Sequence, residues 1–334
     1  MSSKPDGPFQ AAVYSISAIS LLSNSVLLYV YIWCPLNRIK SYKYFFLLTI
    51  LQDVIYSVTF ALNIPQVISQ HSILLLLGTG IVNERSVSFT LILLYGMVFF
   101  VSTLSVTNSF IYRYLHLCRN EFVQRVSSKQ FILIGCLLNM IILGNVFYVL
   151  HVAILPGERF VDFVTKTVIV DGIDMSRAAF FGFSMKYCME SFRLALIIEL
   201  ILLLSLIALV NVFCALKIKS YLKNAKQTSN FLSLQRQMFL LLLLQAACPI
   251  VFLVTPYCFA VFLLFTGIDS NKIITDVLSI LLAVYPIFNP IIIITFMKEY
   301  RNFIAIKLKL SNSHGQSNMP FFLRNFKIAS VHLI

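Results

Sequence analysis

The chain has 334 residues, of which 59% are hydrophobic and 12% are charged, and its formal net charge is +13. A soluble domain carries about 25% charged residues, so water would not solvate the surface that this composition produces. The apolar residues also come in long blocks that no polar face interrupts at helical or strand period. These features exclude a soluble globular domain and indicate a protein whose solvent is the lipid bilayer.

Seven apolar segments are long enough to cross a membrane. A helix needs about 20 apolar residues to span a hydrocarbon layer of about 30 Å. The segments that meet this length are 10–33, 44–69, 88–112, 131–155, 194–216, 238–265 and 273–297. A shorter apolar stretch, 73–82, contains two glycines, and we expect it in an outer loop. The sequence therefore predicts an all-α membrane protein, a bundle of seven transmembrane helices.

Lysine and arginine gather in alternate connections between these helices. Of the 26 basic residues, 18 lie in four segments: 34–43, 113–130, 217–237 and 298–334. The same four segments contain only two acidic residues. Positively charged segments resist translocation and stay in the cytosol, so we expect the amino terminus outside the cell. The same distribution explains the net charge through topology and attraction to anionic lipid. Nucleic-acid binding is therefore not indicated.

The longest outer segment, 156–193, mixes aromatic residues with balanced charge and is predicted to fold as a lid. Within it, 160–170 is rich in β-branched and aromatic residues and is followed by Asp171-Gly172, which predicts a hairpin. Cys188 also lies in this segment. We interpret it as a free thiol, because the seven cysteines show no paired spacing for a disulfide framework or a zinc site.

A short amphipathic helix is predicted directly after the seventh span, at 298–310. Its apolar face consists of Tyr300, Phe303, Ile304 and Leu308. This arrangement suits a helix that lies in the inner membrane interface. Residues 1–310 are thus predicted to form one membrane domain, and 311–334 to form a polar cytoplasmic tail.

Three helices carry polar side chains at a similar depth near the middle of the membrane. These are Asn24, Asp53 and Asn289, the last of which is followed by Pro290. Such groups are costly in a bilayer unless they are partnered, so each marks a functional candidate. One interpretation is a polar core that rearranges as a switch. The alternative is static hydrogen bonding between helices.

Prolines interrupt the last two helices at Pro249, Pro256, Pro286 and Pro290. Proline removes a backbone hydrogen bond and kinks a helix, so these residues suit hinges that splay the inner helix ends. Transmembrane prolines also occur as static bends, and the sequence leaves both interpretations open.

Two charged residues near helix ends are further candidates. Glu199 lies near the outer end of helix 194–216, where it contacts a ligand, pairs with a basic outer residue such as Lys186 or Arg193, or is a snorkelling or protonated structural group. Arg113 stands between Tyr112 and Tyr114 at the inner end of helix 88–112. It is either a contact for a docking partner or a topological anchor with interfacial aromatics.

No catalytic pattern is present. The five histidines are scattered along the chain, and the sequence contains no His-Glu-x-x-His, no Gly-x-Ser-x-Gly and no P-loop. We therefore expect neither an enzyme nor a bound cofactor or metal.

Four segments share a pattern with one family. They are Ser41-Tyr-Lys-Tyr with Asp53 and Tyr56; Phe110-Ile-Tyr-Arg-Tyr; Leu234-Gln-Arg-Gln-Met-Phe with Gln245 and Pro249; and Tyr285-Pro-Ile-Phe-Asn-Pro with Lys298-Glu-Tyr-Arg. Together they resemble the nematode serpentine chemoreceptors of the Str superfamily, which are similar to G-protein-coupled receptors. The resemblance covers residues 10 to 305.

The resemblance implies an odorant or small-molecule receptor in the plasma membrane, in a sensory cilium, that couples to a heterotrimeric G protein. It leaves pairing with a second receptor open. The residues that it places toward the G protein are Tyr112, Arg113, Tyr114, Gln235, Arg236 and Gln237.

The chain departs from the wider receptor pattern at several positions. Tyr112 stands where an acidic residue is usual, so a salt bridge to Arg113 within that helix is in doubt. Ile293 replaces a tyrosine, and Asn289 replaces the aspartate that is usual in the nematode family. No cysteine stands at the outer end of helix 88–112, so the common disulfide to the second outer loop is not expected.

We expect a ligand to enter between the outer halves of the third, fifth, sixth and seventh helices. Their aromatic and aliphatic residues suit an apolar or volatile compound. The candidate lining residues are Tyr95, Phe99, Glu199, Tyr257, Phe259 and Tyr285. The alternative is a small transporter or channel, which predicts internal repeats or several charges along one path. A membrane enzyme is the third possibility.

Overall fold

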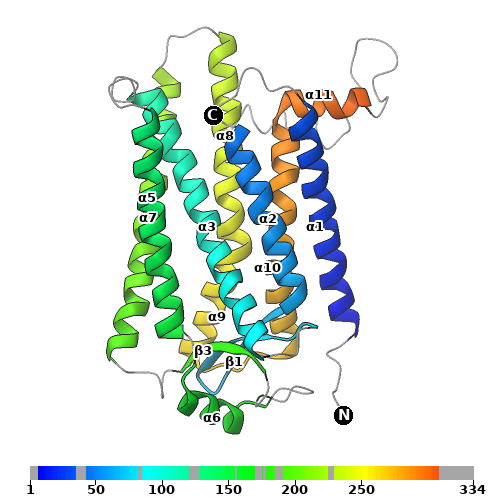
Figure 1. Cartoon of the computed structure of the whole chain (residues 1–334), viewed down its shortest axis with the longest axis vertical. Helices are drawn as coiled ribbons and strands as arrows, with labels where there is room; N and C mark the ends of the chain where they lie inside the picture. Colours follow the sequence, from blue (N-terminus) through cyan, green and yellow to red (C-terminus); the bar gives the residue numbers. More distant parts are fainter. Residues whose placement is uncertain are drawn as a thin grey trace.

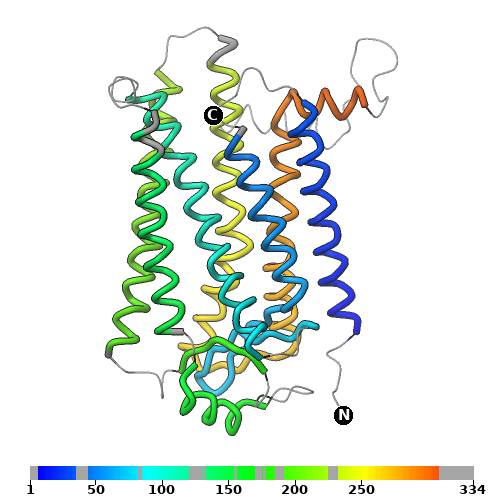
Figure 2. Tube along the Cα trace, viewed as in Figure 1, coloured from blue at the N-terminus to red at the C-terminus, as the bar shows by residue number. Residues whose placement is uncertain are grey.

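The structure is a computed structural model that describes residues 7–34, 43–81, 85–119, 128–154, 156–169, 175, 178–184, 191–224 and 229–307. Within these residues seven helices are long and apolar enough to cross a membrane. They stand side by side as a bundle, as Figure 1 shows and the trace in Figure 2 follows. The predicted seven-helix fold class is confirmed.

The spanning helices follow one another in chain order. They are α1 (Gly7–Trp33), α2 (Lys43–Asn63), α3 (Arg85–Cys118), α5 (Ser128–Val149) with a π-helical turn at Leu150–Ile154, α7 (Ser191–Asn224), α8 (Ser229–Pro249) continued by a π-helical turn at Ile250–Val254 and by α9 (Thr255–Thr266), and α10 (Lys272–Phe296). The helices α3 and α7 are longer than the segments 88–112 and 194–216, because a hydropathy window marks the hydrocarbon crossing and not the turns that extend beyond it.

The second helix ends earlier than the apolar segment 44–69 suggests. Ile64 has a φ of 40°, and the residue before a proline is disfavoured in the α region. Residues from Pro65 onward instead form strand β1 (Pro65–Gln70). The chain then turns through His71 and Ser72, both with positive φ, which is the geometry of a type I′ hairpin turn.

A three-stranded antiparallel sheet closes one end of the bundle. Strand β2 (Ile73–Gly78) pairs with β1 on one side and with β3 (Phe180–Ser184) on the other. The stretch 73–82, expected in a loop, thus contributes the central strand. Its apolar run packs against α6 (Glu158–Thr167), which covers the sheet (Figure 1). We call β1, β2, β3 and α6 the lid, and their end of the bundle the lid end.

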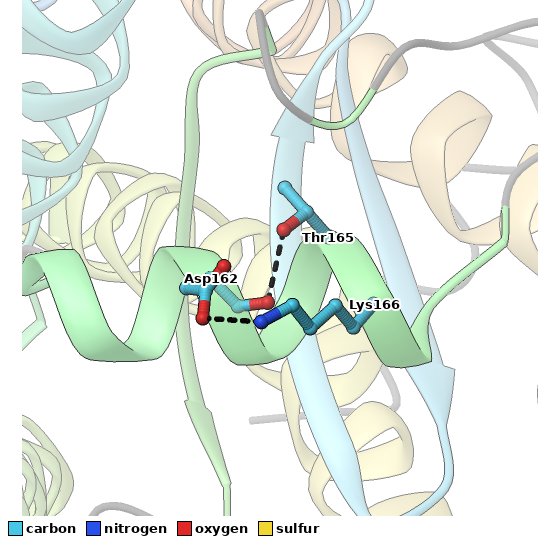
Figure 3. A network of polar contacts seen from close by, with 3 residues as sticks. All are labelled: Asp162, Thr165 and Lys166. Carbon is cyan, nitrogen blue, oxygen red and sulfur yellow. Dashed lines mark hydrogen bonds and ion pairs between the residues drawn. The ribbon is translucent and has the colours of Figure 1, made fainter.

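The hairpin predicted over 160–170 was wrong, because residues 160–167 belong to α6. Phe160 and Val164 are one helical turn apart and both are buried against the sheet, so the helical period prevails over the β propensity of the residues. On the outer face, Lys166 Nζ lies 2.7 Å from Asp162 Oδ2, and Thr165 Oγ1 donates to the Asp162 carbonyl (Figure 3). Asp171-Gly172 and Cys188 lie outside the described residues.

Helix α11 (Lys298–Lys307) follows α10 at the opposite end of the bundle (Figure 1). Tyr300 is buried, and Phe303 and Ile304 pack against the same cluster, which also contains residues of α1, α2 and α8. Burial raises the pKa of the Tyr300 hydroxyl, so this group stays neutral. Leu308 and the predicted tail, 311–334, lie outside the described residues.

Candidate functional site

Asp53 and Asn289 form the centre of a buried polar layer. Asp53 projects from α2 and Asn289 from α10, and Asn289 Nδ2 donates a hydrogen bond to Asp53 Oδ1 over 3.1 Å. Their exposed fractions are 0% and 3%. The structure thus brings together two polar residues that the sequence placed at one depth.

Asn24 completes the layer by capping a carbonyl that a proline leaves free. In a helix the N–H of residue 290 would bond to the carbonyl of residue 286, but Pro290 has no N–H. Asn24 Nδ2 donates to the Pro286 carbonyl over 3.2 Å and thereby replaces the missing bond from a different helix. Asn24 is fully buried. This hydrogen bond is therefore a specific contact between α1 and α10.

Tyr56 caps the second proline of α10 in the same way. Pro286 cannot donate to the Leu282 carbonyl, and the Tyr56 hydroxyl donates to that carbonyl over 2.9 Å. Both carbonyls that the prolines of α10 release inside the bundle are thus bonded by side chains from α1 and α2. The two prolines lie within one continuous helix. Their hydrogen-bond deficit is met from outside α10, which ties the shape of this helix to its neighbours.

Tyrosine hydroxyls continue from Tyr56 toward the lid end. The Tyr56 hydroxyl lies 3.0 Å from the hydroxyl of Tyr95 on α3, and Tyr257 on α9 donates to the Tyr95 hydroxyl over 3.2 Å. Three helices are therefore joined by one chain of hydroxyls. A group that entered between α3 and α9 would compete with the bond between Tyr95 and Tyr257.

Tyr285 joins this chain to the polar layer. Its ring contacts Tyr56 edge-on at a centroid distance of 5.4 Å, and its hydroxyl accepts a hydrogen bond of 3.5 Å from Asn289 Nδ2. The same hydroxyl bonds to Ser102 on α3, whose Oγ accepts from Gln52 Nε2 over 2.8 Å. The network thus reaches from α9 through α3 and α2 to α10.

Three acceptors in this network have no hydrogen-bond partner within the part of the chain that the structure describes. They are Asn24 Oδ1 on α1, and Gln52 Oε1 and Asp53 Oδ2 on α2, and all three are buried. A buried polar atom without a partner raises the free energy of the arrangement that contains it. A rearrangement that supplied a donor to any of these three atoms would therefore lower that free energy.

Sequence reasoning did not single out Gln52 and Ser102 for this site, and it used Tyr56 solely as part of a family pattern. A signal was available on α2, because Gln52, Asp53 and Tyr56 are three polar groups within five residues of an otherwise apolar segment. Ser102 carries no such signal. Serine is common in transmembrane helices and often bonds within its own helix. The sequence therefore did not indicate that Ser102 bonds to Gln52 and Tyr285, and the structure was needed to show it.

The six candidate ligand residues separate into two groups. Tyr95, Tyr257 and Tyr285 belong to the hydroxyl network, and Phe99 packs against the same core cluster. Phe259 is 42% exposed on the outside of α9. Glu199 is exposed on α7 and accepts a hydrogen bond of 2.8 Å from Asn145 Nδ2 of α5, so the structure does not bring it to the tyrosines.

The candidates for a G-protein contact do not form one surface either. Arg113 is 2% exposed, and the Tyr112 ring contacts the His116 ring at a tilt, with a centroid distance of 4.3 Å. Tyr114 lines a cavity of about 400 Å³ between α3 and α7. The three residues of α8 differ in burial along one turn. Gln235 and Arg236 are half-buried and Gln237 is exposed.

The lid is bonded to the connection between α9 and α10. Ser69 N–H donates to Ser270 Oγ over 2.9 Å, and Ser270 N–H donates to the Ser69 carbonyl over 2.7 Å. His71 N–H also donates to Asp269 Oδ1 over 2.7 Å. Val67 of β1 belongs to the same buried cluster as Tyr56 and Tyr95. The sheet therefore packs directly onto the tyrosine network and covers it at the lid end.

Seven spanning helices around a buried polar layer, with a short helix after the seventh, give the architecture of a seven-helix receptor of the G-protein-coupled type. The family described as "Serpentine type 7TM GPCR chemoreceptor Str" matches residues 10–305, so the chain belongs to this family of chemoreceptors. The resemblance expected from the sequence is thereby confirmed. No curated protein matches the chain.

Proposed function

We propose that the chain is a chemosensory receptor that binds a small apolar or volatile ligand from outside and activates a heterotrimeric G protein. The observation that supports this most directly is the network from Tyr257 on α9 to Asp53 and Asn289 at the centre of the bundle. It joins the lid end to the two capped prolines of α10. A disturbance at one end of this network therefore has a physical route to the shape of α10.

The ligand site lies between Tyr95, Phe99 and Tyr257, beneath the lid. Aromatic rings suit an apolar compound, and the hydroxyls of Tyr95 and Tyr257 offer polar contacts that fix its orientation. A ligand there replaces the Tyr95–Tyr257 bond with contacts of its own and moves α9 relative to α3. Since Tyr95 also bonds to Tyr56, this movement changes the cap on the Leu282 carbonyl and hence the bend at Pro286.

The burial of Arg113 supports the view that this arrangement is the resting state. A G protein contacts the inner end of the bundle, and an arginine that is 2% exposed offers it little surface. Outward movement of the inner end of α8, with Pro249 and Pro256 as hinges, would uncover it. The π-helical turn between these two prolines provides the irregular backbone for such a hinge.

The Tyr257→Phe variant tests the ligand site. It removes one hydrogen bond that holds α9 to α3 at rest, and such a bond is worth about 1 kcal/mol, which is roughly fivefold in an equilibrium constant. We expect basal signalling to rise about fivefold by this estimate in cells with a promiscuous G-protein reporter. Tyr148→Phe, on the exposed face of α5, is the matched control. Equal basal signalling in both variants would contradict the proposal.

Orientation follows from the basic connections and is part of the proposal, with the lid outside and α11 in the cytosol. In a background in which Cys118, Cys136, Cys188 and Cys258 are replaced by serine, Arg159→Cys on α6 and Ser220→Cys on α7 place one exposed thiol at each end of the bundle. A membrane-impermeant maleimide added to intact cells should label the Arg159→Cys variant. The Ser220→Cys variant should be labelled only after the cells are permeabilised. Labelling of Ser220→Cys in intact cells would reverse the orientation. The proposed location is the plasma membrane of a sensory cilium.

A further inference from the structure

A groove of about 310 Å³ runs between α7 and α8 near the end of the bundle that carries α11. Its apolar part includes Leu216, Leu240 and Leu243. Leu216 is 63% exposed and Leu243 is 37% exposed, so this part opens on the outer surface of the bundle, where lipid would lie. The groove is therefore separate from the buried polar layer and from the tyrosine network.

Three cationic side chains line the other part of the groove. Lys219 and Lys223 come from the last two turns of α7, and Arg236 comes from the second turn of α8. Among the described residues, no carboxylate lies within ion-pair distance of any of them. Arg236 Nη2 donates to the Leu222 carbonyl over 3.4 Å, while the buried Nε finds no acceptor in the described part of the chain. The groove thus combines concentrated positive charge with an unfilled donor.

The two parts of the groove correspond to two layers of a membrane. Lys219 and Lys223 stand at the end of α7, where lipid headgroups lie, and Leu216 and Leu243 lie further into the span. A phosphate bound by the cations would therefore have its acyl chains at the level of the leucines. A free anion would leave the apolar part unused, and an acidic protein segment would have to enter from the lipid side.

We propose that this groove binds one anionic glycerophospholipid, in the leaflet that the proposed orientation makes cytoplasmic. Its phosphate is held by Lys219, Lys223 and Arg236, and an acyl chain lies along Leu216, Leu240 and Leu243. Because α7 and α8 both contribute to the groove, the bound lipid holds their ends together. Arg236, which family resemblance placed toward the G protein, faces this lipid instead.

The test is native mass spectrometry of the purified full chain titrated with phosphatidylserine or phosphatidylcholine of equal chain length. Phosphatidylserine should bind more tightly. Lys219→Gln and Lys223→Gln should each weaken its binding about fivefold, as expected for one cation beside an anionic headgroup. Lys217→Gln is the matched control, because Lys217 lies on the same helix but over the ring of Phe213 and in the cavity shared with α3. It should bind phosphatidylserine as the natural chain does.

Leu216→Trp examines the apolar part without changing the charge, and we expect it to weaken phosphatidylserine binding as well. Equal binding of the two lipids, or an equal loss in Lys217→Gln, would show that general surface charge suffices and would overturn the proposal. Displacement of the lipid by an equal concentration of glycerophosphoserine, which has no acyl chains, would also overturn it. Unchanged phosphatidylserine binding in a variant carrying both Lys219→Gln and Lys223→Gln would likewise overturn the lipid proposal, and a protein partner would then be the alternative occupant of the groove.

Discussion

Replacing Asn24 with alanine and Tyr56 with phenylalanine is expected to destabilise the bundle, each by about 1 to 2 kcal/mol. Each substitution leaves a buried carbonyl of α10 without the donor that replaces a proline N–H, at Pro286 for Asn24 and at Leu282 for Tyr56. Hydrogen bonds between transmembrane helices average about 0.6 kcal/mol, but a buried acceptor left unpaired costs about 1 to 3 kcal/mol. Because the side chains of Asn24 and Tyr56 are both buried, the cost of an unpaired buried acceptor is the relevant one.

The variant with both substitutions should lose more stability than either alone, because one helical turn of α10 then lacks both caps. Thermal unfolding can be followed by a thiol-reactive fluorophore, since Cys214 and Cys248 are buried and free in the folded chain. Ser25→Ala is the matched control for Asn24. Its hydroxyl donates to the Leu21 carbonyl at 2.7 Å, but on an exposed face of α1. Equal melting temperatures for Asn24→Ala and Ser25→Ala would show that the cap does not stabilise α10.

The seven spans were predictable because the bilayer imposes a length of about 20 apolar residues, whatever the packing. The depth of Asn24, Asp53 and Asn289 was predictable for a related reason. A polar side chain within such a segment stands out, and its distance from the nearest basic connection gives its level in the membrane. Depth alone, however, does not state which atoms meet. The cap on the Pro286 carbonyl depends on the rotation of α1 against α10.

Helix rotation could not be read where apolar residues occupy every face. In α7, Ile198, Leu202 and Leu206 are exposed on the lipid side, and the buried side is just as apolar. Glu199 therefore gave no indication that its partner is Asn145 on α5, away from the tyrosines. Phe259 on α9 presented the same difficulty. A ring fits equally well against lipid or in a ligand site.

The lid was predicted as a feature but not in its form. Its strands carry no Asn-Gly turn, and the positive φ of the type I′ turn falls on His71 and Ser72 instead. The partner strand β3 lies more than a hundred residues further along the chain, and such a distant pairing leaves no local pattern. In α6, spacing was the better guide than composition, because Phe160 and Val164 bury one helical face.

The prolines of α10 and the polar residues around them are best understood together. Proline in a helix leaves a carbonyl free, and in lipid that carbonyl needs a donor from inside the protein. Here the donors belong to α1 and α2, and one of them, Tyr56, also bonds to the Tyr95 hydroxyl on α3. A hinge whose caps come from neighbouring helices can respond to movements of those helices. The proposal that α10 acts as a switch rests on this coupling, while static bends remain the alternative that the sequence left open.

Arg113→Gln is expected to lower ligand-dependent G-protein activation by at least about tenfold, because a hydrogen bond to a charged group contributes about 1.5 to 3 kcal/mol. Ligand affinity should change little, since Arg113 lies at the opposite end of α3 from Tyr95. Both quantities are measured with one ligand, activation by a G-protein reporter and affinity by displacement of a labelled compound. Surface labelling and the thiol melting curve establish that the variant is folded.

Arg119→Gln provides the matched control, because Arg119 also lies at the end of α3 away from the lid but is exposed, with its Nε 3.4 Å from the Tyr114 hydroxyl. It removes the same charge from the same surface, so a general effect of charge on the G protein would appear in both variants. A selective loss in Arg113→Gln requires that the buried guanidinium becomes accessible on activation, which links the opening of the bundle to the partner. Equal activation in the two variants would contradict that link and leave Arg113 as a structural anchor of α3.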